Sequence, residues 1–540
     1  MIDVRARPKL GALLVLLLGM LPLTGPGAAM AQEDDYEAWL RQQRQEYNEY
    51  VDDQEKAFLQ FLESEWETVP VDTALGTPID DKPRRIPSVG DESLPEPTVS
   101  SPEGGEETSR AEPPSRTDRT RPEPEEPPPS PTDRSPPVPS EEEAREVERP
   151  VSEPPSSDPA ESARPTGGTS SGSAANRETS LSFFGTTTTV PYGDALRPQL
   201  SGAPTQSSIQ SFWKQMAEAP HEATLEALQE RRRTLQLSDW GYYRYLRTLS
   251  GRLYDASATN ERTLWTWFML MKSGYAARVG YSDASVVLML PIDALLYDRP
   301  QMRIDGQRYY LMADAGNSLH TYRGEAPVER APLRLNANTL PALEEGRATR
   351  NVEFSAHDQR HKLEIAYDPQ TVEYLNSYPE VELDVLLSAG LSKTAQSSLT
   401  DALRPLVADR SPRAALNGLL SFAQFATTYK RDRDHFGEER FLFPEESLAS
   451  DYSDCEDRAV LLSALVRMLL DRPVVGVRWP NHVALAVRAG DGLSPDADDQ
   501  TYTVDGHTYI LADPTYIGSS LGMIMPLVEG KTPKIIRLKQ

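Results

Sequence analysis

A long stretch dominated by Pro, Ser, Glu, Thr and Arg separates the start of the chain from its C-terminal two thirds. It runs from about Val69 to Ala175 and contains few large apolar residues. Such a segment cannot bury enough surface to offset the entropy that is lost on ordering. We therefore expect a disordered, semi-extended linker here, with folded structure on either side of it.

The first residues have the three parts of a secretory signal. Basic residues lie close to the start, and the apolar run Leu10–Leu23 that follows is too short to span a bilayer comfortably. An A-x-A cleavage site is present at Ala29–Ala31. We expect the protein to be periplasmic or secreted, with no integral membrane span after cleavage. The alternative is a signal that is retained as an anchor.

Between the signal and the linker, residues 33–66 contain apolar side chains at helical spacing and no Pro or Gly. This pattern predicts a long amphipathic helix. The helix either docks on its own protein or self-associates as a coiled coil, or it binds a partner. The apolar stripe comprises Tyr36, Leu40, Tyr47, Tyr50, Val51, Phe58, Leu62 and Trp66.

The composition narrows the class of partner. The chain has 56 basic and 82 acidic residues and a formal net charge of -26, which repels phosphates and anionic headgroups. We therefore expect no nucleic acid partner.

Cys455 is the only cysteine, so no disulfide can form within the chain, even in an oxidising compartment. Such a thiol is either buried and inert or kept for its reactivity.

Beyond the linker, the periodicity changes repeatedly between helix and strand, which is typical of an α+β fold. Helices are predicted at Ile209–Met216, Ala223–Leu235, Trp240–Leu253, Glu261–Lys272, Gln396–Ala408 and Ala414–Tyr429, and another begins at Cys455. Strands are predicted at Ala276–Tyr281, Ser285–Leu290, Arg308–Met312, Val474–Trp479, His482–Val487, Thr501–Val504 and His507–Ala512, with a hairpin at Asn351–Tyr367. The expected organisation is a signal peptide (1–31), an amphipathic helix (32–67), a linker (68–179), a first domain (180–335), a connecting α/β region (336–410) and a second domain (411–540).

The helix that begins at Cys455 carries the strongest chemical signal. Ser453 with Glu456 three residues on is a capping-box pattern, which places the thiol in the first helical turn. Free backbone N–H groups and the helix dipole favour a thiolate there and offer donors to an oxyanion. His482 begins one apolar strand and Asp513 ends another, so paired strands would place a base beside its orienting carboxylate. These three residues, Cys455, His482 and Asp513, are the predicted catalytic set.

This order of residues resembles that of the transglutaminase-like superfamily, a branch of the papain-like fold. DCEDRA, NHVALAV and YILADPT are similar to its three core motifs, and YKRDRDHFGEERFLFPEESLASDYSDCEDR resembles the lead-in of bacterial transglutaminase-like cysteine proteinases. The resemblance covers about residues 414 to 520. It implies a helix packed on an antiparallel sheet, and thiol-mediated acyl transfer on an amide. It also implies a side-chain oxyanion donor upstream of the cysteine, for which Tyr429 and Gln424 are the candidates.

The two domains resemble each other in the order and spacing of their elements. NERTLWTWF…DGQRYYLMAD aligns with CEDRAVLLS…DGHTYILADP, and both contain an Asp-Gly pair that suits a tight hairpin turn. We interpret the first domain as a degenerate copy that lacks the nucleophile and the base. The alternative is that two ordinary α+β segments align by chance. The aligned positions are Asn260 with Cys455, Ser285 with His482, and Asp314 with Asp513.

Other polar residues are assigned structural roles. His507 follows an Asp-Gly turn, so we expect it to be exposed and not to act as the base. His357 and His361 lie in a strand–turn–strand pattern, where their spacing does not put them on one face. We therefore expect no metal and no cofactor. Asp454 and Asp457 are interpreted as helix-terminus and packing charges.

The predicted function is an exported cysteine-dependent amide hydrolase or acyltransferase, of peptidase or transglutaminase type. It would act on protein or peptidoglycan amides through a thioacyl intermediate. Hydrolysis and transfer to an amine share this intermediate, so both reactions stay open. The alternative is a non-catalytic binding or scaffold protein that reuses the fold, with the degenerate copy, the linker and helix 33–66 serving protein contacts.

Overall fold

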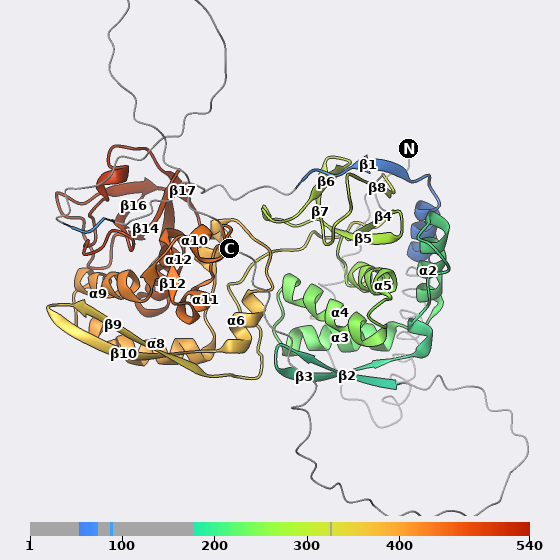
Figure 1. Ribbon diagram of the computed structural model, residues 1–540, viewed down its shortest axis with the longest axis horizontal. Helices are drawn as coiled ribbons and strands as arrows, with labels where there is room; N and C mark the ends of the chain where they lie inside the picture. Colours follow the sequence, from blue (N-terminus) through green and yellow to red (C-terminus); the bar gives the residue numbers. More distant parts are fainter. Residues whose placement is uncertain (1–52, 74–86, 90–176, 325–326, 540) are drawn as a thin grey trace, which may run out of the picture. The chain divides into compact units, whose positions relative to one another are not determined.

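The computed structural model describes residues 53–73, 87–89, 177–324 and 327–539 (Figure 1). The predicted signal, the first part of the predicted N-terminal helix and most of the predicted linker lie outside these residues. The described residues form a mixed α+β structure built on antiparallel sheets. No helix among them is long and apolar enough to cross a membrane.

The elements follow the predicted order closely. The helices are α2 (Gln206–Glu218), α3 (Glu222–Thr234), α4 (Asp239–Leu253), α5 (Thr259–Lys272), α6 (Pro369–Leu375), α7 (Leu383–Ser388), α8 (Lys393–Val407), α9 (Pro412–Phe425), α10 (Asp432–His435), α11 (Pro444–Ala449) and α12 (Cys455–Leu470). The strands are β1 (Glu67–Pro70), β2 (Arg177–Phe183), β3 (Thr186–Tyr192), β4 (Arg278–Ser282), β5 (Ser285–Leu290), β6 (Gln301–Ile304), β7 (Gln307–Leu311), β8 (Ser318–Thr321), β9 (Ala348–Ala356), β10 (Gln359–Tyr367), β11 (Thr428–Tyr429), β12 (Tyr452–Ser453), β13 (Val474–Trp479), β14 (His482–Arg488), β15 (Thr501–Val504), β16 (His507–Ala512) and β17 (Lys534–Ile536).

The described end of the N-terminal helix, residues 53–62, packs on the first domain. Phe58 is buried with its ring 4.7 Å from that of Trp213, and Lys272 donates to Glu55. These residues therefore dock on their own protein, which was one of the two alternatives for this helix.

The predicted linker is interrupted in two places. Strand β1 pairs with β8 from Glu67 to Pro70, with Val69 buried, and residues 87–89 contact the second domain. The prediction of a continuous linker over 68–179 is thus wrong at these positions. Composition did not reveal them because a short strand needs only one or two buried side chains when its backbone pairs with a distant strand.

Each domain contains one larger sheet with a helix packed on it, besides a two-stranded sheet. In the first, the strand order is β1-β8-β4-β5-β7-β6, and α5 packs on β5 (Figure 1). In the second, the order is β15-β16-β14-β13-β17, and α12 packs on β14 (Figure 1). Apart from β1, the two orders are the same when the strands are matched along the chain, and every pair within these two sheets is antiparallel.

The strand registers agree as well as the strand orders. Ser285 closes the β4–β5 hairpin opposite Ser282, and His482 closes the β13–β14 hairpin opposite Trp479. The turns at Asp305-Gly306 and Asp505-Gly506 both have positive φ at each residue, as a two-residue hairpin turn of this kind requires.

The strand registers make Ala313, and not the predicted Asp314, the residue of the first domain that is equivalent to Asp513. The β5–β7 ladder pairs Met289 with Leu311, and the β14–β16 ladder pairs Ala486 with Leu511. Two residues beyond these partners are Ala313 and Asp513. At the matching positions the first domain therefore has none of the three residue types predicted to be catalytic, including the acid.

Helix α9 ends earlier than predicted. Helix α9 stops at Phe425, and Thr428 and Tyr429 form β11, which pairs in parallel with β12. The helical pattern over Ala414–Tyr429 is thus too long at its end, because the backbone of these two residues bonds to the strand that leads into α12. The β9–β10 hairpin turns at His357, as predicted.

Candidate active site

Helix α12 starts at Cys455, but its capping residue lies one position later than the capping pattern predicted. The N-cap is Asp454, and the Asp457 carboxylate accepts from its backbone N–H at 3.2 Å. Ser453 cannot serve as the cap because it belongs to strand β12. Glu456, the other half of the predicted box, is turned instead toward the thiol. The predicted location of the cysteine in the first helical turn is nevertheless confirmed.

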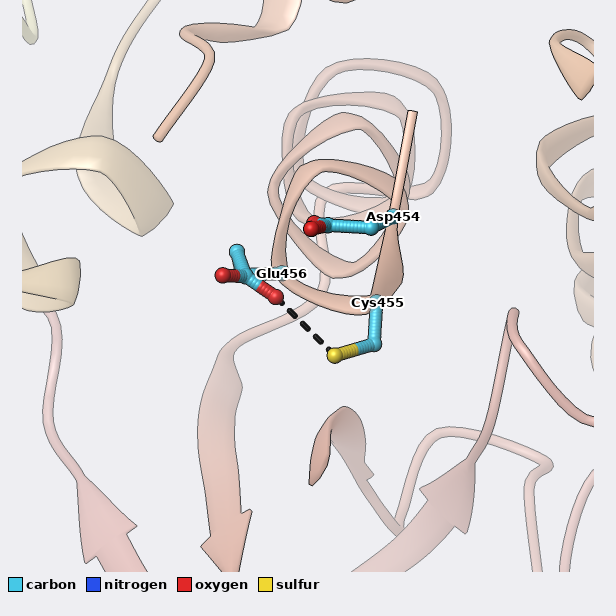
Figure 2. Close-up of side chains that lie close together, drawn as sticks. All are labelled: Asp454, Cys455 and Glu456. Atoms are coloured by element: carbon cyan, nitrogen blue, oxygen red, sulfur yellow. Dashed lines mark hydrogen bonds between the residues drawn. The ribbon is translucent and has the colours of Figure 1, made fainter. Parts of the chain in front are cut away.

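The thiol lies in an acidic, closed environment. Cys455 is 0% exposed, and its Sγ donates to Oε2 of Glu456 at 2.9 Å (Figure 2). The side chains of Asp454 and Glu456 lie to the same side of the helix start as the sulfur (Figure 2). The helix N-terminus favours negative charge on sulfur, whereas these carboxylates oppose it.

Four carboxylates gather beside the thiol. One oxygen from each of Asp432, Glu439, Asp454 and Glu456 lies within 4.8 Å of the others. Such an all-oxygen set matches the ligands that a hard cation such as Ca²⁺ takes in proteins, so these residues could hold one. The sequence did not suggest this arrangement because Asp432 and Glu439 precede the helix by many residues, and only the fold brings them to it.

The predicted base and its orienting acid are in contact. Nε2 of His482 lies 2.8 Å from Oδ2 of Asp513, and both side chains are 0% exposed. The other oxygen of Asp513 accepts from the backbone N–H groups of Thr515 and Tyr516. The Trp479 ring stacks on the imidazole, with centroids 5.6 Å apart and planes 19° apart. The imidazole is thus held by a bonded carboxylate on its edge and an indole on its face.

The remaining imidazole nitrogen is available for proton transfer. Nδ1 of His482 is buried and has no hydrogen-bond partner within the part of the chain that the structure describes. When Nε2–H donates to Asp513, Nδ1 carries the lone pair, which is the tautomer a general base needs. Strand β14, which begins with His482, packs against α12, which begins with Cys455.

The two oxyanion candidates differ in their engagement. The Gln424 amide donates to Tyr516 O at 3.0 Å and to Ser519 O at 3.2 Å, and its oxygen accepts from Gly518 N. It therefore holds the loop after Asp513. Gln424 and Tyr429 both line a cavity of about 360 Å³.

A buried cation lies one helical turn after the cysteine. Arg458 is 2% exposed and donates through Nη2 to Thr427 O at 2.9 Å. Burial lowers the pKa of Arg458 to about 10, and the charges of Tyr429, Asp454 and Cys455 oppose that shift. The guanidinium therefore stays charged at neutral pH and offsets part of the negative charge around the helix start. The sequence analysis did not single out Arg458.

The lead-in segment before α11 is held by carboxylates. Four successive backbone N–H groups donate to Asp432 (from Arg440), Glu380 (from Phe441), Asp457 (from Leu442) and Glu446 (from Phe443), at 2.9–3.0 Å. Burial raises the pKa of Glu380 to about 8 and that of Glu446 to about 7. This segment carries Glu439, so its fixation also positions the acidic group beside the thiol.

The three other histidines considered from the sequence lie on strand β16 and on the β9–β10 hairpin. His507 is exposed and its Nδ1 lies 3.1 Å from Nη2 of Arg488, as its predicted surface position implies. His361 Nε2 lies 3.2 Å from the Ala356 carbonyl, and His357 is at the turn of the same hairpin. Neither belongs to a group that could hold a metal among the described residues.

Comparison with known proteins returns no match: no family model, no curated protein and no solved structure matches this chain. A functional assignment must therefore be derived from the chain's own residues.

Proposed function

We propose that this chain is an exported, thiol-dependent amidase or acyltransferase whose reacting groups are Cys455, His482 and Asp513. The observation that carries the proposal is the buried imidazole–carboxylate pair, in which Nε2 is bonded to Asp513 and Nδ1 is left for a proton from a thiol. The packing of α12 on β14 supports Cys455 as the source of that proton.

In the proposed reaction, Nδ1 of His482 accepts the thiol proton, and Sγ of Cys455 forms a bond to the carbonyl carbon of an amide. Negative charge then develops on the carbonyl oxygen, where the Cys455 backbone N–H and the Tyr429 hydroxyl are the proposed donors. The imidazolium returns its proton to the leaving amine as the C–N bond breaks, which leaves a thioester. Water or another amine then gives its proton to His482 as it attacks the thioester, and His482 returns that proton to Sγ of Cys455 as the C–S bond breaks.

The same residues and strand orders support a family assignment for the second domain and a duplication within the chain. We assign the second domain to the transglutaminase-like branch of the papain-like fold. Residues 180–335 are then a duplicated copy without the catalytic residues. The matching strand orders and hairpin registers support the duplication. Export to the periplasm or the medium rests on the predicted signal.

One observation favours a second function. Cys455, His482 and Asp513 are each 0% exposed, so the site is closed. A closed site suits a binding or scaffold protein that keeps the fold without using its chemistry. The enzyme requires that the side chains over the sulfur move before a substrate enters.

The test is to trap the acyl-enzyme. The full chain is incubated with p-nitrophenyl acetate as a general acyl donor, and the modified residue is located by mass spectrometry. We expect an acetyl group on Cys455, and its absence in Cys455→Ser and in His482→Ala. A folded protein that never acylates would support the scaffold function. Incorporation of a fluorescent primary amine into a protein acceptor would then separate transfer from hydrolysis.

A further inference from the structure

A short N-terminal segment lies against the second domain beside the candidate site. The backbone N–H of Ile517 donates to Pro87 O at 3.1 Å, and Val89 N–H donates to Ile517 O at 2.9 Å. Ser88 and Ile517 thereby form a parallel bridge, visible in Figure 1 as the short blue segment at the second domain. Pro87 is buried, whereas Val89 is 45% exposed.

The backbone that receives this segment is tied to the candidate site. Ile517 follows Asp513 by four residues, and the Asp513 carboxylate fixes the intervening turn through Thr515 N and Tyr516 N. Gln424 holds the other side of the loop through Gly518 N.

Ile517 also lines the cavity of about 360 Å³ that Tyr429 and Arg458 line. A chain lying along residues 516–518 therefore runs beside a cavity lined by the proposed oxyanion donor and by the cation that follows the nucleophile.

We propose that residues 516–518 are a docking edge for an extended polypeptide, and that Pro87–Val89 occupies it as an internal competitor of the substrate. The mode of binding is strand addition, in which backbone hydrogen bonds give affinity and the side chains that face the protein give selectivity. The competitor role rests on the proposed function, whereas the docking edge does not.

The chemistry of the edge defines the ligand class. Both hydrogen bonds involve only backbone groups, so any extended peptide can form them. The buried Pro87 indicates a preference for a compact apolar residue at that position. Gly518, at φ +77°, has no side chain next to Val89. A Cβ added to Gly518 would lie 3.8 Å from Cβ of Val89. The occupant is thus an extended strand with small or apolar side chains.

Tethering makes so small a contact effective. A segment of the same chain is present at an effective concentration of about millimolar, so two hydrogen bonds and one buried ring suffice to keep the edge filled. A substrate that makes more contacts along the cavity would displace it. The edge therefore admits extended chains that bind better than the resident segment.

The experiment uses proline to remove one hydrogen bond at a time. Val89→Pro deletes the donor to Ile517 O, whereas Ser88→Pro, the matched control, alters a residue whose N–H is not used in this bridge. Hydrogen exchange of the full chain, read by mass spectrometry over residues 514–520, reports the Ile517 N–H. We expect exchange there to be about tenfold faster in Val89→Pro and unchanged in Ser88→Pro. A synthetic peptide of residues 84–92, RRIPSVGDE, should restore the slow exchange.

The outcomes separate the two parts of the proposal. Equal exchange in the wild type and Val89→Pro, or equal acceleration in both proline variants, would overturn the docking edge. The same measurement in Cys455→Ser is independent of any thiol chemistry, so it holds even where the proposed function fails. For the competitor role, alkylation of Cys455 by iodoacetamide should be faster in Val89→Pro and slowed by the peptide. An unchanged alkylation rate, with exchange altered as expected, would overturn that role alone.

Discussion

The two domains place different polar residues on the same framework. In both, a helix packs on the second strand of the first hairpin, and the sheet orders and registers agree. In the first domain, the helix start carries Asn260. Its side chain donates to Ala284 O at 2.9 Å and accepts from Val286 N at 2.8 Å, which joins the helix to the start of β5.

The second domain has titratable side chains at the positions where the first has neutral ones. Its helix begins with Cys455, and its strand begins with His482 bonded to Asp513, all three fully buried. Burying titratable side chains costs stability unless each is well satisfied. The Asn260 bridge shows that this framework can be joined with one neutral amide. A buried base and acid in the second domain therefore point to a selected use.

The largest expected effect follows from removing the imidazole of His482, the predicted base, which the first domain lacks at the matching position. We expect His482→Ala to lower the alkylation rate of Cys455 at about pH 6 to 7 by about 10²- to 10⁴-fold, because the thiol loses the group that accepts its proton. The rate is measured with iodoacetamide on the folded protein and compared with that of a model thiol.

The matched control for this change is His507→Ala, which removes an exposed histidine from the adjacent strand β16. It should leave the alkylation rate unchanged. A comparable loss in His507→Ala, or a wild-type rate no faster than the model thiol, would end the case for His482 as the base.

The next effect concerns the four carboxylates beside the start of α12. Among the described residues, no such group lies at the start of α5 in the first domain. Although the sequence alone predicts no metal, we expect Ca²⁺ to raise the thermal midpoint, because a hard cation would relieve repulsion among Asp432, Glu439, Asp454 and Glu456. At a free concentration 100-fold above Kd the gain is about 2.7 kcal/mol. Differential scanning calorimetry with Ca²⁺ or with a chelator measures it.

Two variants of helix α10 make this test specific. Asp432→Asn removes one carboxylate of the cluster and should reduce the shift. Asp434→Asn changes a half-exposed residue of the same helix, bonded to Arg431, and should leave the shift intact. An equal shift in both variants would mean that the cation binds elsewhere.

The sequence predicts those parts of this arrangement that depend on residues close together in the chain, and misses those that depend on distant ones. Helix α12 and strands β14 and β16 were predictable because apolar periodicity and the Asp-Gly turns are local signals. The order Cys455, His482, Asp513 was also readable, and the contact of the last two is present. Local patterns did not reveal the shift of the cap from Ser453 to Asp454, since that depends on the pairing of β12 with β11.

Long-range pairings escaped prediction for the same reason. Strand β1 and residues 87–89 lie in a region of linker-like composition, and only their partners, β8 and Ile517, make them ordered. The engagement of Gln424 with residues 516–519 and the approach of Asp432 to Glu456 likewise join distant parts of the chain. Spacing along the sequence carries no information on such contacts.

A smaller effect tests the structural half of the comparison. Asn260→Ala removes both hydrogen bonds to the 284–286 backbone and leaves the part-buried Val286 N–H without its acceptor. We expect a loss of about 1–2 kcal/mol in the free energy of unfolding, measured with urea. Asn260→Asp keeps the acceptor and should cost less. Equal costs for the two substitutions would show that the amide does not join the helix to the strand.

The smallest effect is the pH dependence of stability that comes from Glu380, a residue of the connecting region that holds the lead-in segment of the second domain. Burial raises the pKa of Glu380 from 4.5 to about 8, so between these values the folded protein holds a proton that the unfolded chain releases. Stability therefore falls as pH rises through that window and changes no further above it. Glu380→Gln keeps an acceptor for Phe441 N–H without the charge. We expect the variant to match the wild type near pH 5 and to exceed it near pH 8. Because Glu380 is partly exposed, solvent screening limits the gain to about 1 kcal/mol.

Thermal midpoints measured at several pH values test this expectation. Glu373→Gln, on the exposed face of α6, serves as the control and should shift the midpoint equally at all pH values. Part of the fall in stability with pH should persist in Glu380→Gln, because burial also raises the pKa of Glu446 to about 7. Glu446 accepts from Phe443 N–H of the same lead-in segment. A gain that is larger near pH 5 than near pH 8 would reverse the sign of the argument. It would mean that Glu380 stabilises the lead-in as a carboxylate.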